Sequence, residues 1–359
     1  MTESIPEAGS TEHVQGRSGE GAQPPRRPTL DEVARRAGVS RSVASRAINH
    51  TRDVSPAKRE AVERAAEELG YTPHASARAL ATSRVGSVVL AVLDEEPEHF
   101  SEPFFSQVVV GINTVLAAAE LDLTLMLAST RESRARLERL LRSHGADGVM
   151  IMAPRGEEPL VAVADRSAMP IVFGGRPMHG GGERYIDVDN RGGARAATEH
   201  LLSTGRERIA ALRGPYDLEA ADARHRGFTE ALAVAGLRAD RVEGADFSFA
   251  DGERAMTRLL ASHPGLDAVF AASDTMAAGA LRALRAHGRS VPGDVAVVGF
   301  DDLAIARQVD PPLTTVRQPF HAFGQEIASM LLREMTGARH SPLILPTQLV
   351  VRDSAPARG

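Results

Sequence analysis

The chain has 359 residues, which is enough for two or three domains. Its composition, 43% hydrophobic and 25% charged, is typical of a globular protein with a substantial core. The absence of cysteine excludes a disulfide scaffold, a zinc finger, an iron–sulfur centre and a cysteine nucleophile. Residues 1–25 contain no apolar stretch that could act as a secretory signal, and the uncharged residues 103–119 are too short and polar to span a bilayer. We therefore expect a cytoplasmic protein.

The formal net charge of −5 is unevenly distributed along the chain. Residues 26–84 hold 12 basic and 7 acidic side chains, whereas residues 85–359 hold 29 basic and 36 acidic ones. A short basic module beside a long acidic body suggests that one end of the chain meets a polyanion. A locally basic, solvated helix face is the plainer alternative.

The N-terminal part is predicted to be a tail followed by a small helical bundle. Residues 1–28 are rich in Gly, Ser, Glu, Gln and Pro and have little to bury, which indicates disorder. Residues 29–72 contain three runs of apolar residues at helical spacing. Each run follows a residue that can cap a helix: Thr29, Ser40 and Ser55. Thr29 and Glu32 also fit a capping box, and Pro56 suits the first position of the third helix.

Residues 86–351 alternate short β-branched or apolar runs with longer helical stretches. The strand candidates are Ser87–Leu93, Leu123–Leu127, Gly148–Met152, Pro170–Phe173, Ile209–Leu212, Ala268–Ala271 and Val295–Gly299. The helices between them are expected to begin near Phe105, Glu132, Glu157, Arg191, Ala221, Asp251 and Thr275. This alternation predicts an α/β fold with parallel sheets covered on both faces, and its length favours two lobes with a cleft between them.

Residues 29–49 carry the strongest functional signal. A DNA-reading helix-turn-helix needs a small residue in its first helix, a glycine in the turn and apolar residues on the inner face of its second helix. These positions are filled by Ala34, Gly38, Val43 and Ile48. The outer face of the second helix then presents side chains that can bond phosphates or base edges: Arg41, Ser42, Ser45 and Arg46. A plain helical hairpin with a basic face is the alternative.

At this point the sequence resembles the LacI/GalR family of bacterial transcription regulators. The resemblance begins with TLDEVARRAGVS at residues 29–40 and continues through VSPAKR at 54–59 and ELGYTP at 68–73. Further matching motifs lie in the body at residues 76–80, 224–228, 273–281, 298–302 and 312–319. Motifs in this order over residues 29–350 are highly specific. They imply a helix-turn-helix bundle joined to a two-lobed, periplasmic-binding-protein-like body.

The resemblance implies the following division of the chain. A DNA-binding domain spans 29–72, a hinge helix and linker 73–85, and an effector-binding and dimerisation domain 86–351, before a C-terminal tail at 352–359. The expected lobes are residues 86–187 with 319–345, and residues 188–318 with 346–351. The end of the chain has no leucine heptads for a tetramerising coil, so a homodimer is expected.

The resemblance also implies a set of DNA contacts. Arg41, Ser42 and Arg46 occupy the positions that read bases in the major groove, and an arginine fork suits guanine O6 and N7. The expected phosphate contacts are Thr29, Ser40, Ser45, Asn49, Ser55 and Lys58. Leu80 stands where a leucine of the hinge helix, here residues 73–81, wedges into the minor groove, although an ordinary linker contact is the alternative. The chain departs from the family at Val43-Ala44, where Thr-Val is common, and at His74, where asparagine is usual.

Effector contacts are expected between the lobes, because ligands of such folds bind at the carboxyl ends of the strands. Arg176, Asp274 and Asp301 follow strand candidates, and Phe104 and Phe105 open the first helix of the body. By resemblance, further effector contacts are Arg224, Ser273 and the aromatic wall Phe247. The alternatives are a buried ion pair between Arg224 and Asp301, a core position for Phe105, and helix-capping roles for Asp274 and Asp302.

No motif points to catalysis, a metal site or a cofactor. The residues SPAK at 55–58 lack the partners of a serine hydrolase, and residues 187–198 fail as a calcium loop, because Arg191 and Thr198 stand at ligand positions. We therefore expect a repressor that is not an enzyme, that binds near-palindromic operator DNA as a homodimer, and that responds to a mono- or disaccharide. The alternatives are a solute-binding protein of a transport system, which would need an export signal or an anchoring cysteine, and an α/β enzyme, which would need a convergent catalytic group.

Overall fold

The computed structural model describes residues 28–49, 53–72, 85–93, 103–156, 158–338 and 341–358. The chain divides into two compact units, Met1–Ser83 and Arg84–Gly359, and each is described by itself. Residues 1–27 of the expected tail lie outside the described residues. The same holds for the expected hinge helix, including His74 and Leu80.

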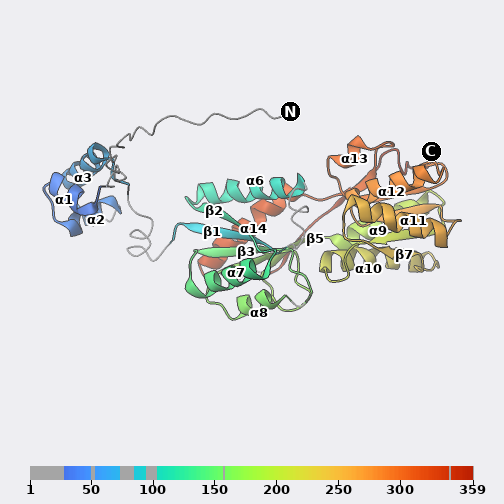
Figure 1. Cartoon of the computed structure of the whole chain (residues 1–359), viewed down its shortest axis with the longest axis horizontal. Helices are drawn as coiled ribbons and strands as arrows, with labels where there is room; N and C mark the ends of the chain where they lie inside the picture. The colour runs from blue at the N-terminus through green and yellow to red at the C-terminus, as the bar shows by residue number, and fades with distance from the viewer. Residues whose placement is uncertain are drawn as a thin grey trace, which may run out of the picture. The chain divides into compact units, whose positions relative to one another are not determined.

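The first unit contains the three expected helices, α1 (Leu30–Arg36), α2 (Arg41–Ile48) and α3 (Pro56–Leu69) (Figure 1). Thr29 and Glu32 form the predicted capping box, and the Ser40 hydroxyl accepts a hydrogen bond from the Val43 amide at the start of α2. Gly70 ends α3 at a φ of 63°, a left-handed conformation that glycine adopts without a steric penalty. Apolar side chains from all three helices meet in one small core around Val33, Ala44 and Val62.

The first lobe of the body is a parallel six-stranded sheet in the order β11-β5-β4-β3-β1-β2. Its strands are β1 (Ser87–Val92), β2 (Asp122–Leu127), β3 (Gly148–Met152), β4 (Ile171–Gly174), β5 (Tyr185–Val188) and β11 (Leu343–Leu345). One face is covered by α6 (Pro103–Ala118) and α14 (Phe320–Met335), and the other by α7 (Arg131–Ser143) and α8 (Pro159–Asp165). Because both faces are buried, most strands are continuous apolar runs.

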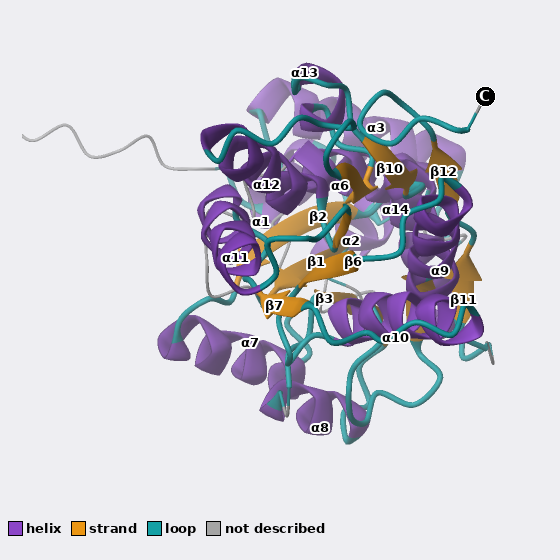
Figure 2. Ribbon diagram, turned by 90° about the vertical axis from the view of Figure 1, so that its right-hand side faces the viewer, coloured by secondary structure: helices purple, strands orange, loops and turns teal. Residues whose placement is uncertain are grey.

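The second lobe has the same design, with the strand order β12-β10-β9-β8-β6-β7 and one antiparallel edge strand. Its strands are β6 (Ile209–Arg213), β7 (Val242–Gly244), β8 (Ala268–Ala271), β9 (Ala296–Asp301), β10 (Thr314–Arg317) and β12 (Gln348–Val350). Its helices are α9 (Asn190–Ser203), α10 (Glu219–Val234), α11 (Phe249–Ser262), α12 (Asp274–Ala286) and α13 (Ile305–Gln308). Figure 2 shows α9 and α10 on one side of this sheet and α11 and α12 on the other.

The chain passes between the two lobes three times, at residues 188–190, 317–320 and 345–348. The described residues 352–358, set apart above as a C-terminal tail, pack on the second lobe. The Ser354 hydroxyl donates to the Val297 carbonyl, and Ala355 is fully buried. The end of the chain therefore contributes to the core of this lobe.

The predicted α/β fold with two largely parallel sheets is confirmed, and the seven predicted strands are present within two residues of their expected bounds. Strands β5, β7, β10, β11 and β12 were not predicted from the sequence, because they have only three or four residues each, and all but β11 include polar or charged side chains. The close crossing of α6 and α14 was also not predicted. A Cβ on Gly111 would lie 2.2 Å from the His321 carbonyl oxygen, so only glycine permits this approach.

Candidate functional site

The start of α2 presents a row of exposed polar side chains. Arg41, Ser42 and Arg46 are exposed, whereas Ala44 and Ala47 on the opposite face are fully buried in the bundle core. The Arg41 Nε lies 3.6 Å from the Asp31 carboxylate, and the Arg46 Nε donates to the Ser42 carbonyl. The face predicted to read bases is therefore open to solvent along the first two turns of the helix.

Most of the expected phosphate contacts lie at or near the helix ends, and Ser45 lies in the middle of α2. The hydroxyls of Thr29 and Ser40 cap α1 and α2, and the Asn49 amide donates to the Ser45 carbonyl. Two further positions begin α3: Ser55, whose hydroxyl makes no capping bond, and Lys58, which is exposed. Val43, where the family commonly has a hydroxyl, is partly buried against the bundle core.

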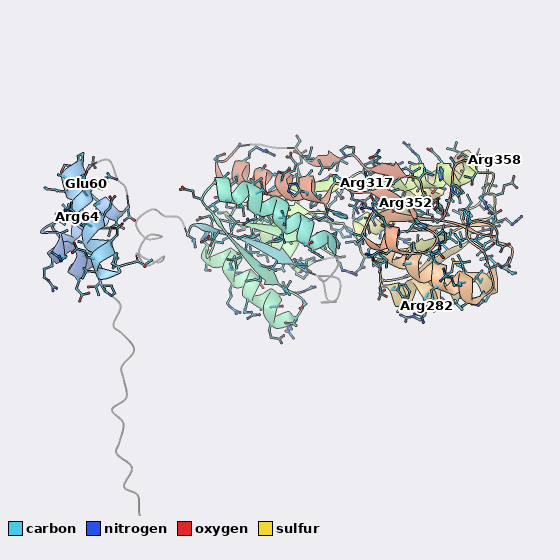
Figure 3. The ribbon with its side chains drawn as sticks, turned by 90° about the horizontal axis from the view of Figure 1, so that it is seen from above. Glu60, Arg64, Arg282, Arg317, Arg352 and Arg358 are labelled. Atoms are coloured by element: carbon cyan, nitrogen blue, oxygen red, sulfur yellow. The ribbon has the colours of Figure 1, made fainter. Side chains whose placement is uncertain are left out.

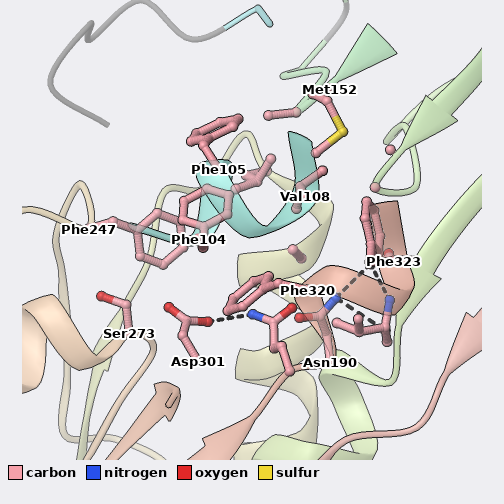
Figure 4. A pocket seen from close by; sticks show the side chains of 18 of the residues that line it. Phe104, Phe105, Val108, Met152, Asn190, Phe247, Ser273, Asp301, Phe320 and Phe323 are labelled. Carbon is pink, nitrogen blue, oxygen red and sulfur yellow. Dashed lines mark hydrogen bonds between the residues drawn. The ribbon is translucent and has the colours of Figure 1, made fainter. Parts of the chain in front are cut away.

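The body contains a cavity between its lobes, and six of the eight predicted effector contacts line it: Phe104, Phe105, Arg224, Phe247, Ser273 and Asp301. The first two come from α6 in the first lobe, and the others come from the second lobe. Figure 4 shows Phe104, Phe105 and Phe247, together with Ser273, Asp301 and Asn190, among the side chains that line this cavity. The cavity thus combines aromatic walls with a group of polar side chains.

We call the linked side chains Asn190, Arg224, Asp301 and Gln318 the polar floor of this cavity. The Arg224 Nε donates to the Asn190 Oδ1 over 2.9 Å, and its NH1 lies 3.3 Å from the Asp301 Oδ1. The Gln318 side-chain amide donates to the same Asp301 oxygen. The Asn190 amide in turn donates to buried Asp187 at the end of β5, so the bonds run from the second lobe into the first.

Arg224 is almost completely buried, with 6% of its surface exposed. Burial lowers the pKa of its guanidinium, and the negative charges of Asp301, Asp187 and Asp274 oppose this shift. The guanidinium also lies 3.9 Å from the centre of the Phe300 ring, within cation–π range. A buried cation held by partners on several sides is rigid. It can therefore present its donors in a fixed direction.

Asp301 and Asp302 have positive φ angles, of 114° and 54°, which are rare for residues other than glycine. The side chains of these two neighbouring residues lie in different environments. Asp301 lines the cavity, whereas the Asp302 carboxylate is 1% exposed and pairs with Arg317 and Arg352. Figure 3 shows these two arginines close to one another. The pairs of Asp302 hold the end of β9 in the backbone conformation that directs Asp301 to the cavity.

The aromatic walls have different degrees of burial. The ring centres of Phe104 and Phe320 are 5.3 Å apart. Phe105 is 3% exposed: it belongs to the core of the first lobe and also lines the cavity. Phe247 has a φ of 76° and lies directly before Ser248, the cap of α11. Its partly buried ring faces the cavity from the second lobe.

Two predicted effector contacts do not line the cavity, and both assignments need correction. Asp274 is fully buried at the start of α12, where its carboxylate accepts hydrogen bonds from the Leu303 amide and the Thr315 hydroxyl. Asp274 therefore links the start of α12 to the segment after β9 and to β10. The side chain of Arg176 is exposed and lies over the Tyr185 ring at 5.8 Å. Ser273 lines the cavity but also caps α12 through the Met276 amide.

Five polar residues of the cavity were not predicted as part of the site: Arg155, Asp187, Asn190, Thr275 and Gln318. In the sequence, Asp187 and Asn190 stand in the segment 187–198 that fails as a calcium loop. Their position between a strand and a helix would have indicated a connection between the lobes if β5 had been predicted. Gln318 follows the equally unpredicted β10. Arg155 follows β3 in a loop that carries no motif, so nothing in the sequence pointed to it.

Among the described residues, no helix is long and apolar enough to cross a membrane, and no cluster of three potential metal ligands occurs. A helix-turn-helix bundle and a two-lobed α/β body with a polar-floored cavity together define a ligand-responsive DNA-binding protein. The comparisons with known proteins agree with this class. The chain matches the bacterial regulatory proteins of the lacI family at residues 29–74 and the periplasmic binding protein-like domain at residues 198–355.

Similar proteins extend the match over most of the chain. The transcriptional regulator CelR of Thermobifida fusca is 44% identical over 335 residues, covering 92% of this chain and 98% of the relative. The regulator GalR of Escherichia coli is 36% identical over 308 residues, covering 85% and 88%. This chain belongs to the lacI family of bacterial regulatory proteins, as the sequence predicted.

Two solved structures share the fold. The complex of the regulator CelR with cellobiose superposes with a TM-score of 0.73 at 42% identity and covers 91% of this chain and 100% of that one. The lac repressor dimer bound to operator and the anti-inducer ONPF superposes with a TM-score of 0.81 at 29% identity and covers 92% and 100%.

Proposed function

We propose that the chain is a transcriptional repressor that binds near-palindromic operator DNA as a homodimer, and that a sugar bound in the cavity controls its affinity for DNA. It would act in the cytoplasm, where its DNA partner lies. The observation that carries the effector part is the Arg224–Asp301 pair, which lies on the polar floor with phenylalanine rings on the cavity walls.

The exposed start of α2 supports the DNA-binding part. Arg41 and Arg46 can reach base edges from this face, and an arginine fork can bond guanine O6 and N7 together. The proposed phosphate contacts are Thr29, Ser40, Ser45, Asn49, Ser55 and Lys58. The related lac repressor is bound to its operator as a dimer, which supports a homodimer on a two-fold symmetric site here. We retain residues 73–81 as a hinge helix with Leu80 as its wedge.

The chemistry of the cavity supports a sugar as effector. A pyranose ring has hydroxyls around its edge and an apolar face. Asp301 can accept from these hydroxyls, Arg224 and Gln318 can donate to them, and a phenylalanine can cover the apolar face. The complex of the related regulator CelR with cellobiose supports a disaccharide. The proposed contacts are Phe104, Phe105, Asn190, Arg224, Phe247, Ser273, Asp301 and Gln318.

The test has two steps on the full chain. A thermal-shift screen with mono- and disaccharides should identify sugars that raise the melting temperature, because a ligand that binds only the folded state stabilises it. Gel-shift titrations on an operator, with and without the best sugar, should then show a change in DNA affinity. The sign of this change distinguishes an inducer from a corepressor. A chain that binds DNA but responds to no sugar would contradict the sugar part alone.

A further inference from the structure

The cavity has a second polar group, at a distance from its floor. Arg155 lines the cavity from the loop that follows β3 in the first lobe, and its NH1 lies 3.5 Å from the Asp217 carboxylate in the loop that follows β6. The Gly156 amide also donates to the Asp217 carbonyl over 2.7 Å. These contacts join the two lobes. We call the loops 153–156 and 214–218 the lip of the cavity.

The strand order separates the lip from the polar floor. In the first sheet, β4 lies between β3, which leads to Arg155, and β5, which leads to Asn190. In the second sheet, β8 lies between β6, which leads to Asp217, and β9, which ends at Asp301. Two strand spacings correspond to about 10 Å in each sheet. This separation resembles the length of two linked pyranose rings.

The backbone and side chains of the lip hold Arg155 in place. Ala153, two residues before it, has a φ of 53°, and the Arg155 side chain is 21% exposed. A free arginine side chain samples many rotamers, so an ion pair that fixes its fork in advance reduces the entropy lost when a ligand binds. Asp217 is itself 53% exposed and belongs to the opposite lobe. It is therefore placed to orient the guanidinium from the opposite lobe.

We propose that Arg155, oriented by Asp217, is a specificity-determining residue that contacts the second ring of a two-ring sugar. The inference rests on the proposed function, because it assigns a ligand class to the same cavity. A monosaccharide on the polar floor would not reach the lip. A disaccharide would engage Arg224 and Asp301 with one ring and Arg155 with the other. Asp217 is a positioning residue in this arrangement.

The test is calorimetric titration of the full chain with cellobiose, maltose and lactose, each compared with glucose. The parent chain should bind at least one disaccharide more tightly than glucose. Arg155→Ala should weaken disaccharide binding by about tenfold or more, as expected for a lost charge-assisted hydrogen bond, and change glucose binding by less than about twofold. Asp217→Asn should cause a smaller loss in the same direction. Arg176→Ala, an exposed arginine outside the cavity, is the matched control and should change neither.

The outcomes separate this inference from the proposed function. If the parent chain binds glucose as tightly as every disaccharide, or if Arg155→Ala weakens both classes equally, the distal role of Arg155 is wrong while the sugar site stands. If the parent chain binds no sugar, the proposed effector class fails, and this inference fails with it. Should Arg155→Ala not fold, Arg155→Gln, which keeps length and polarity, decides between the same outcomes.

Discussion

Arg224 and Asp301 face each other on the floor of the cavity, with the Arg224 NH1 3.3 Å from the Asp301 Oδ1. Neither residue depends on this pair alone. Arg224 also donates to the Asn190 side chain and the Ala272 carbonyl, and Asp301 accepts from Gln318. A ligand hydroxyl can therefore replace part of the pair without leaving the buried guanidinium unpartnered. The buried ion pair of Arg224 and Asp301, which the sequence offered as the alternative to effector contacts, can therefore also act as a ligand site.

Asp301→Asn should abolish the effector response and leave specific DNA binding intact. The amide keeps the size of the side chain but removes one of the negative charges that offset the burial of Arg224, and its own donors would oppose those of Arg224 and of a ligand hydroxyl. Gel shifts with and without sugar measure the response, and thermal melts check the fold. Effector binding at the parental affinity in a folded Asp301→Asn chain would exclude Asp301 as a contact.

The repression phenotype of Asp301→Asn also shows whether the sugar weakens or strengthens DNA binding. If the sugar releases the repressor from DNA, the variant should repress permanently. If the sugar is needed for binding, the variant should fail to repress.

Arg41→Ala should cost about 1–3 kcal/mol of specific DNA binding and relax the base preference at one position in each half-site. Lys58→Ala should instead weaken binding to all sequences alike and reduce the salt dependence, because a phosphate contact releases counterions without reading bases. Selection of binding sites from a random pool, together with salt titrations, measures both effects. An unchanged preferred sequence for Arg41→Ala would show that another residue reads that base pair.

The stability of the body should depend on pH through Asp274. Burial raises the pKa of this carboxyl well above its usual 3.8, and the charge of Asp301 raises it further. A raised carboxyl pKa means that the folded state holds its proton more tightly than the unfolded state. The proton on Asp274 therefore favours the folded state at low pH. This contribution to the free energy of unfolding decreases as the pH rises from 3.8 through the raised pKa. Asp274→Asn removes this dependence.

Urea unfolding of the body between pH 4 and pH 8 measures this difference. The free energy of unfolding of Asp274→Asn, relative to the parent chain, should increase with pH over this range. The adjacent Asp302 is the matched contrast. Burial would raise its pKa, but hydrogen bonds from Arg352 and Arg317 outweigh burial and lower it. Asp302→Asn should therefore lose stability relative to the parent at neutral pH. A constant difference for Asp274→Asn would contradict its raised pKa.

Gly111→Ala should destabilise the first lobe by about 1–3 kcal/mol, as overpacked core substitutions do. The new methyl group would meet the backbone of α14, which cannot move aside as a flexible side chain can. The gain in helix propensity, about 1 kcal/mol or less, opposes this loss without cancelling it. Gly145→Ala is the control, because its Cβ would make only ordinary contacts at 3.5 Å. Chemical unfolding of both variants gives the comparison, and equal stabilities would refute the close helix crossing.

The sequence by itself determined the features that depend on neighbouring residues. Thr29 and Ser40 mark helix starts because their hydroxyls bond amides three residues away, and Ser55 marks one because Pro56 follows it at the first helical position. The strands β1, β3 and β8 could be predicted because both of their faces are buried, which makes them continuous apolar runs. The motif order then identified the family. The sequence also placed Arg224, Phe247 and Asp301 in one site, through resemblance.

Only the tertiary structure decided which polar residues share that site. Asn190, Gln318 and Arg155 lie far apart in the chain and line one cavity because three segments cross between the lobes and parallel strands end there. It also assigned different roles to two adjacent residues. Ser273 touches the cavity, whereas Asp274 turns into the core, because the first residues of a helix point in different directions. Which of the two side chains turns into the core depends on contacts of Asp274 with Leu303 and Thr315, which lie about 30 and 40 residues further along the chain, so no local pattern encodes it.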